Sequence, residues 1–275
     1  MSGILYIVAT PIGNLEDITL RALRILREAD LIACEDTRQT RKLLDHYGIQ
    51  KPAVSYHEHN EAARATELVE KVRAGQKIAL VSDAGTPLVS DPGYRLVSQA
   101  AAAGLRVESI PGPSAAIAAL AASGLATDAF YFAGFLPART TQRRKTLTKL
   151  KDLAATLVFY EAPHRVLETL ADIEETLGSR PVVLARELTK LHEELLRGTP
   201  AELRQAHISL RGEFTILVGR ATGPSAEDLE VPVRDAVEAR MREGLSRMDA
   251  MKAVARERGL SKRDVYKEIE SGCGT

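Results

Sequence analysis

Two carboxylates and several glycines and prolines stand close together in Ser82–Leu96, which reads SDAGTPLVSDPGYRL. The stretch follows a short apolar run, Lys77–Val81, and precedes an alanine-rich segment with helical spacing. In open α/β sheets, loops at the carboxyl ends of strands bind ligands. Asp83 and Asp91 are acceptors in such a loop, while glycine frees the backbone and proline stiffens it. We therefore predict a ligand-binding loop here; the alternative is a rigid turn that closes the sheet.

Five shorter segments at predicted strand ends share this composition of glycine, proline, hydroxyl residues and carboxylates, with few lysines. Such loops favour backbone recognition of a neutral or zwitterionic small molecule over a triphosphate. They are residues 10–14 (TPIGN), 35–38 (EDTR), 57–61 (HEHNE), 111–115 (PGPSA) and 160–165 (YEAPHR).

Several common cofactor motifs are missing from the sequence. No G-x-G-x-x-G follows the first apolar run and no G-x-x-x-x-G-K-[ST] occurs, so dinucleotide and P-loop triphosphate sites lose their main support. His57 and His59 lie in a loop without the H-E-x-x-H spacing of a helical zinc site. We predict no metal site.

Composition places the chain among ordinary globular enzymes. It has 275 residues, 45% apolar and 27% charged, and its 37 basic residues equal its 37 acidic residues in number. The total charge therefore predicts no polyanion partner, although a neutral total can hide a basic patch. The two cysteines, Cys34 and Cys273, imply neither a disulfide framework nor a zinc site. The start of the chain lacks a signal-peptide pattern, and no apolar run is long enough for a membrane span, so we expect a cytoplasmic protein.

The order of apolar runs predicts two α/β domains. In residues 1–126 five short runs alternate with helical segments, which indicates a mainly parallel sheet with right-handed crossovers. In residues 127–222 the rhythm changes, and strands are expected in a mixed second sheet. The expected strands are 4–9, 31–34, 53–56, 77–81 and 106–110 in the first domain, then 130–135, 156–161, 181–187, 194–198 and 212–220 in the second.

Local signals also place helix ends and a third part of the chain. We expect a helix over 40–47, and Ser114 as the N-cap of the alanine-rich helix after it. Residues 222–231 have the composition of a linker. In 232–271, Ser-x-x-Asp signatures at Ser246 and Ser261 predict capped helices, and the segment resembles a helix-turn-helix. Its role is either nucleic-acid binding or docking, or it is a helical appendage packed on the body.

One segment is strongly basic. Residues 139–151 hold six cations and no acid, next to the aromatic run FYFAGF at 130–135. At helical spacing these cations form a basic face, which favours binding of phosphates over a merely solvated helix. The predicted RNA-binding residues are Arg139, Arg143, Arg144, Lys145, Lys149 and Arg165, with Lys151, Arg38, Arg41 and Lys42 as possible extensions of the surface.

Taken together, nine motifs over about residues 4 to 220 resemble the ribosomal RNA methyltransferases among the tetrapyrrole-methylase-like, S-adenosylmethionine-dependent methyltransferases. The resemblance implies 2′-O-methylation of a cytidine ribose in the decoding region of 16S rRNA. It also implies a homodimer that holds S-adenosylmethionine in a cleft between two α/β domains. The motifs are ATPIGNLEDIT, CEDTRQTRKLL, HEHNE, VSDAGTPLVSDPGY, PGPSA, GFLP, FYEAPHR, ELTKLHEE and RGEFTILV.

The resemblance also assigns cofactor contacts by position. Small-molecule members of the family have a G-x-G-x-G motif where this chain has TPIGN, a departure that argues against a porphyrinoid substrate. The implied contacts are Pro11, Gly13, Asp83, Ala84, Gly85, Leu88, Val89, Ser90, Ser114, Ala115, Tyr160, Pro163, Gly212, Glu213 and Thr215, with core packing as the alternative for Leu88 and Val89.

Methyl transfer to a hydroxyl needs an acceptor placed in line with the methyl group and a site that excludes water. A general base contributes ~10²–10⁴-fold to such a step. The candidate bases are Glu35, Asp36, His57, Glu161 and His164. For Glu161 the alternative is a cofactor contact, and for His164 it is a helix cap. Two other functions stay open at this point: a small-molecule or protein methylase, and a non-catalytic RNA-binding protein.

Overall fold

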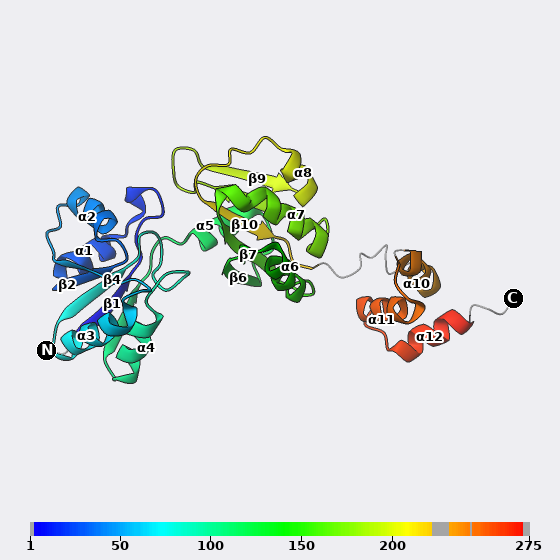
Figure 1. Ribbon diagram of the computed structural model, residues 1–275, viewed down its shortest axis with the longest axis horizontal. Coiled ribbons are helices and arrows are strands. Elements are labelled where there is room, and N and C mark those ends of the chain that lie inside the picture. Colours follow the sequence, from blue (N-terminus) through cyan, green and yellow to red (C-terminus); the bar gives the residue numbers. More distant parts are fainter. Residues whose placement is uncertain (1–2, 222–230, 243, 272–275) are drawn as a thin grey trace. The chain divides into compact units, whose positions relative to one another are not determined.

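The computed structural model describes residues 3–221, 231–242 and 244–271. Contacts divide the chain into two units, Met1–Arg220 and Ala221–Thr275, and each is described by itself (Figure 1). The first unit holds two β-sheets and the second holds helices, which confirms the predicted fold class. The predicted domain boundaries at 126 and 222 stay predictions, and the expected linker at 222–231 lies, except for Val231, outside the described residues.

The first sheet has the strand order β3-β2-β4-β1-β5, and every neighbouring pair is parallel. Its side chains alternate between two cores because successive residues of a strand face opposite sides. Tyr6 and Val8 pack with α1 and α2, whereas Leu5 and Ile7 pack with α3 and α4. The elements are β1 (Ile4–Val8), a 3-10 turn (Leu15–Asp17), α1 (Leu20–Glu28), β2 (Leu31–Cys34), α2 (Thr37–His46), β3 (Ala53–Ser55), α3 (Glu61–Arg73), β4 (Lys77–Val81), α4 (Tyr94–Ala102) and β5 (Arg106–Ile110).

The second sheet has the order β6-β7-β10-β8-β9; β6 and β7 are parallel and the other pairs antiparallel. Leu157 and Phe159 face the core with α6, α7 and α8, whereas Val158 faces the core with α5. The elements are α5 (Ala115–Ser123), β6 (Phe130–Phe135), α6 (Thr140–Lys149), β7 (Thr156–Glu161), a 3-10 turn (Pro163–Arg165), α7 (Val166–Leu177), β8 (Val182–Arg186), β9 (Glu194–Gly198), α8 (Pro200–Gln205) and β10 (Phe214–Val218).

One predicted helix start differs from the structure and another agrees with it. Helix α2 begins at Thr37 rather than at residue 40, because an Asp36 carboxylate oxygen accepts a hydrogen bond from Arg38 N at 2.8 Å and caps the first turn. Ser114 stands at the N-cap of α5 as predicted, although its side chain makes no capping hydrogen bond. The hydroxyl of Ser114 instead lines a cavity.

The second unit contains α10 (Val233–Arg242), α11 (Arg247–Glu257) and α12 (Lys262–Ser271). Its core includes Val237, Val254 and Val265. Both predicted caps form, because Ser246 Oγ and Ser261 Oγ each accept a hydrogen bond from the backbone N–H three residues later at 3.2 Å. Within the described part of the chain, no helix combines the length and the apolar character that crossing a membrane requires.

Candidate functional site

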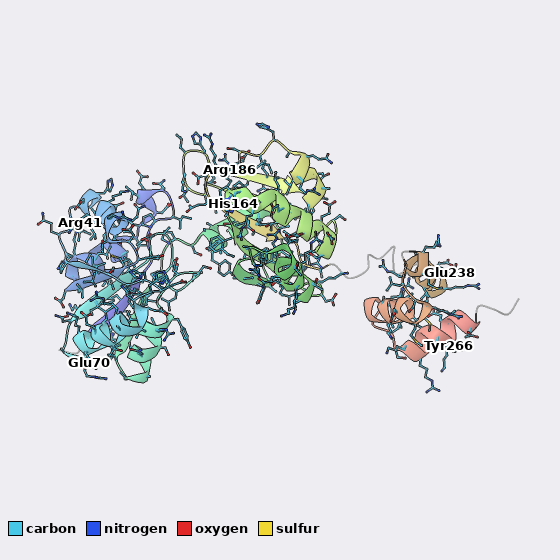
Figure 2. The ribbon with its side chains drawn as sticks, viewed as in Figure 1. Arg41, Glu70, His164, Arg186, Glu238 and Tyr266 are labelled. Atoms are coloured by element: carbon cyan, nitrogen blue, oxygen red, sulfur yellow. The ribbon has the colours of Figure 1, made fainter. Side chains whose placement is uncertain are left out.

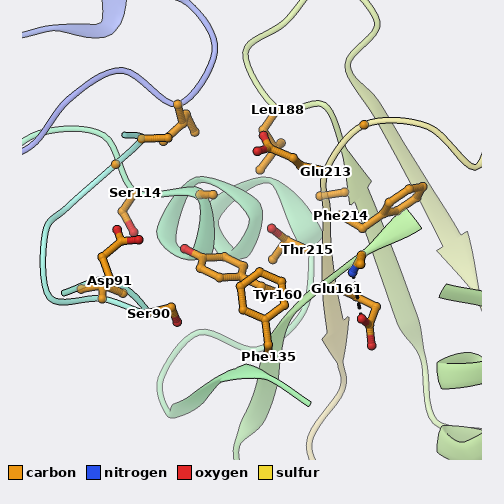
Figure 3. Close-up of a pocket in the computed structure, with 18 of the residues that line it drawn as sticks. Ser90, Asp91, Ser114, Phe135, Tyr160, Glu161, Leu188, Glu213, Phe214 and Thr215 are labelled. Carbon is orange, nitrogen blue, oxygen red and sulfur yellow. Dashed lines mark hydrogen bonds between the residues drawn. The ribbon is translucent and has the colours of Figure 1, made fainter. Parts of the chain in front are cut away.

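A cavity of about 410 Å³ lies within the first unit, where loops of the first sheet face the ends of strands of the second (Figure 3). Its size falls in the range of small-molecule sites. Most residues that the sequence assigns to cofactor binding line it. These are Asp83, Ala84, Gly85, Val89, Ser90, Ser114, Ala115, Tyr160, Pro163, Gly212, Glu213 and Thr215.

Three predicted cofactor contacts do not line the cavity. The Leu88 side chain packs on the core of the first sheet, as the core-packing alternative proposed. Gly13 lies against Lys190: a Cβ at position 13 would stand 2.4 Å from Lys190 Cγ. Between Gly13 and Pro11, it is Ile12 that lines the cavity. The TPIGN loop therefore contributes its central apolar side chain to the wall.

The Ser82–Leu96 loop is pinned to its neighbours. Thr10 and Gly85 exchange both backbone hydrogen bonds, at 2.8 and 3.0 Å, which joins the loops after β1 and β4. Thr86 Oγ1 donates a hydrogen bond to Pro113 O at 3.1 Å, which ties the loop after β4 to the loop after β5. Ser90 has a φ of 66°, in the left-handed region that a non-glycine residue rarely adopts. Such backbone strain gathers at ligand sites, where the surrounding structure holds it in place.

Carboxylates give one wall of the cavity a negative charge. Burial raises the pKa of Asp91 to about 6, and the nearby charges of Glu35 and Asp83 add to the effect. The pKa of Asp83 is also raised, first by desolvation, while the Asp36 N–H donates to Asp83 Oδ1 at 3.1 Å and opposes the shift. The pKa of Glu35 is raised by desolvation and by Asp83. Because the acids raise one another's pKa, a cation bound here would relieve their repulsion.

Aromatic rings form the opposite wall. Tyr160 contacts Phe132 and Phe135 edge-on, with ring centroids 4.9 and 5.7 Å apart. Its hydroxyl oxygen accepts a hydrogen bond from Ala116 N at 3.3 Å, at the start of α5, and burial raises the pKa of the phenol. Figure 3 shows the rings of Tyr160 and Phe135 side by side, across the cavity from Asp91. The site thus pairs an anionic wall with an apolar one.

Glu161 lines the cavity, but its carboxylate is occupied. Oε1 accepts from Ala162 N at 2.8 Å and is paired with the Arg165 guanidinium, while Oε2 accepts from Thr169 Oγ1 at 2.7 Å. In Figure 3 this side chain points away from Asp91. Its position fits a clamp between β7 and α7 better than a free base. Arg165 is held in the same pair, with 15% of its side chain exposed, and its place on an RNA-binding surface stays a prediction.

The other predicted bases lie outside the cavity lining. His164 is exposed on the turn before α7 (Figure 2). His57 is half-buried in the loop after β3, where its ring is 3.3 Å from Asn60 Nδ2. Glu35 acts on the cavity through the charge it adds near Asp91. Asp36 is bonded to Arg38 by its carboxylate, at 2.7 Å from Nη2.

Some lining residues were not assigned by the sequence. Asp91 is the most informative, because the sequence shows it as an acceptor in the loop but the family motif gave no contact for it. The others are Thr86 and six apolar residues, of which Ile12 and Ala162, like Thr86, lie in loops that the sequence predicted at strand ends. They are Ile12, Thr86, Phe135, Ala162, Ala185, Leu188 and Phe214. Among the residues that the structure describes, no group of three His, Cys, Asp or Glu side chains is arranged to hold a metal ion.

The predicted basic face on α6 is only partly present. Arg143 is 1% exposed, and its Nε donates to Asp172 Oδ2 on α7 at 2.5 Å, so its assignment to an RNA surface is wrong. Arg144 bonds Asp172 Oδ1 at 2.6 Å and is also paired with Glu175. The 139–151 segment has no acid of its own, but α7 supplies the acids. The cations that stay exposed are Arg139, Lys145, Lys149 and Lys151.

Comparison with known proteins gives one consistent result. Residues 4–204 match the family described as Tetrapyrrole (Corrin/Porphyrin) Methylases. A ribosomal RNA small subunit methyltransferase I from Halalkalibacterium halodurans is 50% identical, over 96% of this chain and 93% of the relative. The same-named protein of a Synechocystis species is 48% identical, over 96% of each chain. The crystal structure of uroporphyrin-III-C-methyltransferase from Thermus thermophilus has a TM-score of 0.57 at 24% identity, covering 79% of this chain and 94% of that one, and this likeness shows the fold.

Proposed function

Because this chain belongs to the tetrapyrrole methylase family, and within it to the ribosomal RNA small subunit methyltransferase I proteins, we propose that it methylates 16S rRNA. The methyl donor is S-adenosylmethionine and the acceptor is the 2′-hydroxyl of a cytidine ribose in the decoding region. The observation that carries the proposal is the cavity lined by carboxylates and aromatic rings, in a chain half identical to proteins of that name.

The residues of the cavity fit S-adenosylmethionine. Its sulfonium and ammonium groups are cationic and suit the wall of Asp83 and Asp91, whose pKa values are raised. The apolar surface of Tyr160 and Phe135 suits the adenine ring or the carbon chain. The hydroxyls of Ser90 and Ser114 provide donors and acceptors for the ribose. When bound, the cofactor supplies an electrophilic methyl group, and the transfer is a direct in-line displacement.

The chain's own contribution is to position groups and to exclude water. The loop pinned by the Thr10–Gly85 pair holds the carboxylates in place before the substrate arrives, so little reorganisation is needed. The ribose proton passes to a carboxylate that lines the anionic side of the cavity, Asp83 or Asp91. A carboxyl whose pKa is near 6 is suited to accept a proton near neutral pH. Glu161 suits this role less well, because both of its oxygens already accept hydrogen bonds.

Recognition of rRNA falls to exposed cations outside the cavity. Arg139, Lys145 and Lys149 remain exposed on or beside α6, and Arg41 and Lys42 on α2. We assign to these side chains contacts with phosphates, which fix the register of the RNA. The protein works as a homodimer in the cytoplasm, a proposal that follows the family resemblance. Very exposed apolar side chains, such as Leu191 at 93%, are consistent with burial between subunits.

The test uses purified protein, radiolabelled S-adenosylmethionine, and small ribosomal subunits or 16S rRNA from a strain that lacks the corresponding gene. We expect label in 16S rRNA, and mass spectrometry of its nucleosides should find 2′-O-methylcytidine. A methyl group on a base would keep the methyltransferase assignment and overturn the ribose acceptor. The absence of any incorporation into either substrate would contradict the proposal as a whole.

A further inference from the structure

Strand β6 has one residue more than its neighbour β7 at the end that reaches the cavity. Phe132 pairs with Val158 as in a regular ladder. Two residues later on β7, Tyr160 pairs with Phe135, which is three residues later on β6. This irregularity is a β-bulge, which is rare between parallel strands. Gly134 has a φ of 64° within it, in the left-handed region that glycine adopts without strain.

The bulge turns the side chain of Phe135 toward the cavity. In a regular strand Phe135 would share a face with Ala133 and pack on the core with α6 and α7, because residues two apart face the same side. With the extra residue, Phe135 instead contacts Tyr160 edge-on at the other face of the sheet. Leu136 packs on the core in its place. The bulge therefore exposes a phenylalanine that a regular strand would bury.

The ring of Phe135 lies at the mouth of the cavity. It lines the cavity and yet keeps 57% of its surface exposed, whereas the neighbouring Tyr160 is half-buried (Figure 3). The strand is held close to the Ser82–Leu96 loop, since a Cβ at Gly134 would stand 2.8 Å from Ser90 Oγ. The ring is thus placed by its backbone, and more than half of its surface is available to a second ligand.

The chain that follows Phe135 supports an RNA ligand. Arg139 is exposed four residues later, at the start of the segment that leads into α6. Pro137 lies between the two and restricts the backbone that joins them. An exposed aromatic ring followed by a cation is a combination that binds single-stranded nucleic acid, where the ring stacks on a base and the cation contacts the backbone.

We propose that Phe135 forms a nucleobase subsite at the mouth of the cavity, where its ring stacks on the unpaired base of the nucleotide that receives the methyl group. That a nucleotide is the acceptor rests on the proposed function. A ribose whose 2′-hydroxyl enters the cavity carries its base on the adjoining carbon, so the base stands beside the mouth. The side of the ring that lines the cavity remains available to the cofactor, and the exposed side takes the base.

Stacking also provides what the reaction requires of the acceptor. Enzymes that modify a nucleotide within a structured nucleic acid take it out of its stack, and this loss of stacking costs free energy. An aromatic ring at the site replaces the lost stack and holds the nucleotide in place. Because every base has a face that can stack, the subsite positions the acceptor and does not by itself select cytidine.

The first test replaces the ring and measures methyl transfer to small ribosomal subunits and to 16S rRNA. Phe135→Leu keeps an apolar side chain but has no ring to stack, so kcat/KM for the RNA should fall about tenfold or more. Phe135→Tyr should stay within about threefold of the unchanged protein. Circular dichroism checks that both variants fold. If Phe135→Leu methylated the RNA as well as the unchanged protein does, the inference would be overturned.

The control for this exchange is Phe130→Leu at the start of the same strand. Phe130 is 45% exposed and does not line the cavity, so its exchange should change kcat/KM for the RNA by less than about twofold. Affinity for S-adenosylmethionine is measured by calorimetry, and in Phe135→Leu it should fall less than kcat/KM for the RNA. A larger loss of cofactor affinity would place the ring against the cofactor alone and contradict the subsite.

The second test uses fluorescence, because the sequence contains no tryptophan. Phe135→Trp and Phe130→Trp each introduce one indole, at the subsite and at the control position. With 16S rRNA added until filter binding shows saturation, the emission of Phe135→Trp should be quenched by a stacked base, and that of Phe130→Trp should stay unchanged after correction for absorption. Equal quenching of both variants, or quenching of Phe135→Trp by S-adenosylmethionine alone to the same extent, would overturn the inference.

Failure of this inference can be told from failure of the proposed function. If the unchanged protein methylates 16S rRNA and Phe135→Leu does so equally well, only the inference is wrong. If 16S rRNA quenches the emission of Phe135→Trp selectively but receives no methyl group, only the proposed function is wrong.

Discussion

The Ser82–Leu96 loop holds two carboxylates and helix α6 holds several cations, and folding treats these charges differently. In the loop, Asp83 and Asp91 have no cationic partner among the described residues, and their pKa values are raised by burial and by neighbouring acids. On α6, Arg143 and Arg144 both bond Asp172 of the next helix. Like charges therefore mark a site only where the fold gives them no partner of opposite charge. Each prediction below tests either the unpaired carboxylates of the loop or the cations of α6.

The largest expected effect is on stability, from Arg143→Met. Removing Arg143 leaves Asp172 buried with fewer partners, and breaking a buried ion pair typically costs about 3–5 kcal/mol. We expect the loss of stability to lie near the low end of this range, because Arg144 still bonds Asp172. Urea unfolding followed by circular dichroism measures the free energy of unfolding.

The control for this variant is Lys145→Met, on the exposed side of the same helix, which should change stability by less than about 0.5 kcal/mol. If Arg143→Met were as stable as the unchanged protein but bound 16S rRNA more weakly, Arg143 would belong to the RNA surface after all and the contrast between the two regions would fail.

The second prediction concerns the carboxylates of the Ser82–Leu96 loop, which have no cationic partner among the described residues. Asp91→Asn removes a negative charge from the cavity wall, so affinity for S-adenosylmethionine should fall by roughly 10- to 100-fold, as expected for a charge-assisted contact. Isothermal titration calorimetry measures it. The control Glu70→Gln alters an exposed carboxylate on α3 that takes no part in the cavity and should bind the cofactor normally. Normal binding by Asp91→Asn would mean that the anionic wall does not face the cofactor.

The third prediction uses the pKa of Asp91, which is raised from 3.8 to about 6. A cationic ligand prefers the ionised carboxylate, so cofactor affinity should rise several-fold as pH increases from 5 to 7. The stability of the folded protein changes with pH in the opposite direction. The contribution of Asp91 is fully present below its unfolded pKa of 3.8 and is lost as pH rises through about 6. Calorimetric titrations at pH 5, 6 and 7 should show the rise in affinity, and Asp91→Asn should flatten it. A profile that stays equally steep in Asp91→Asn would assign the pH dependence to another group.

The comparison also explains how far the sequence predicts this molecule. Strands and helices of the first sheet follow from local apolar patterns, and the loops at the carboxyl ends of its strands gather because parallel strands end at one edge. Partners distant in sequence are not encoded locally: Asp172 lies 29 residues from Arg143, and Thr169 lies on the helix after Glu161. The error at Arg143 has this cause, since a partner across the fold decides whether its charge reaches solvent; the partner of Arg165, Glu161, is only four residues away.

The smallest expected effect belongs to the cations that α6 keeps exposed. Lys145→Glu together with Lys149→Glu should weaken binding to 16S rRNA a few-fold to about tenfold and reduce the salt slope by roughly 0.7 per phosphate, while cofactor affinity stays unchanged. Lys42→Glu on α2 tests whether the RNA surface extends to the first sheet, and Lys71→Glu on α3 is the control, because Lys71 is already paired with Glu67. If the α6 pair had no effect, the remaining charge of that helix would be merely solvated, and the uncompensated cations that recognise RNA would have to lie elsewhere in the chain.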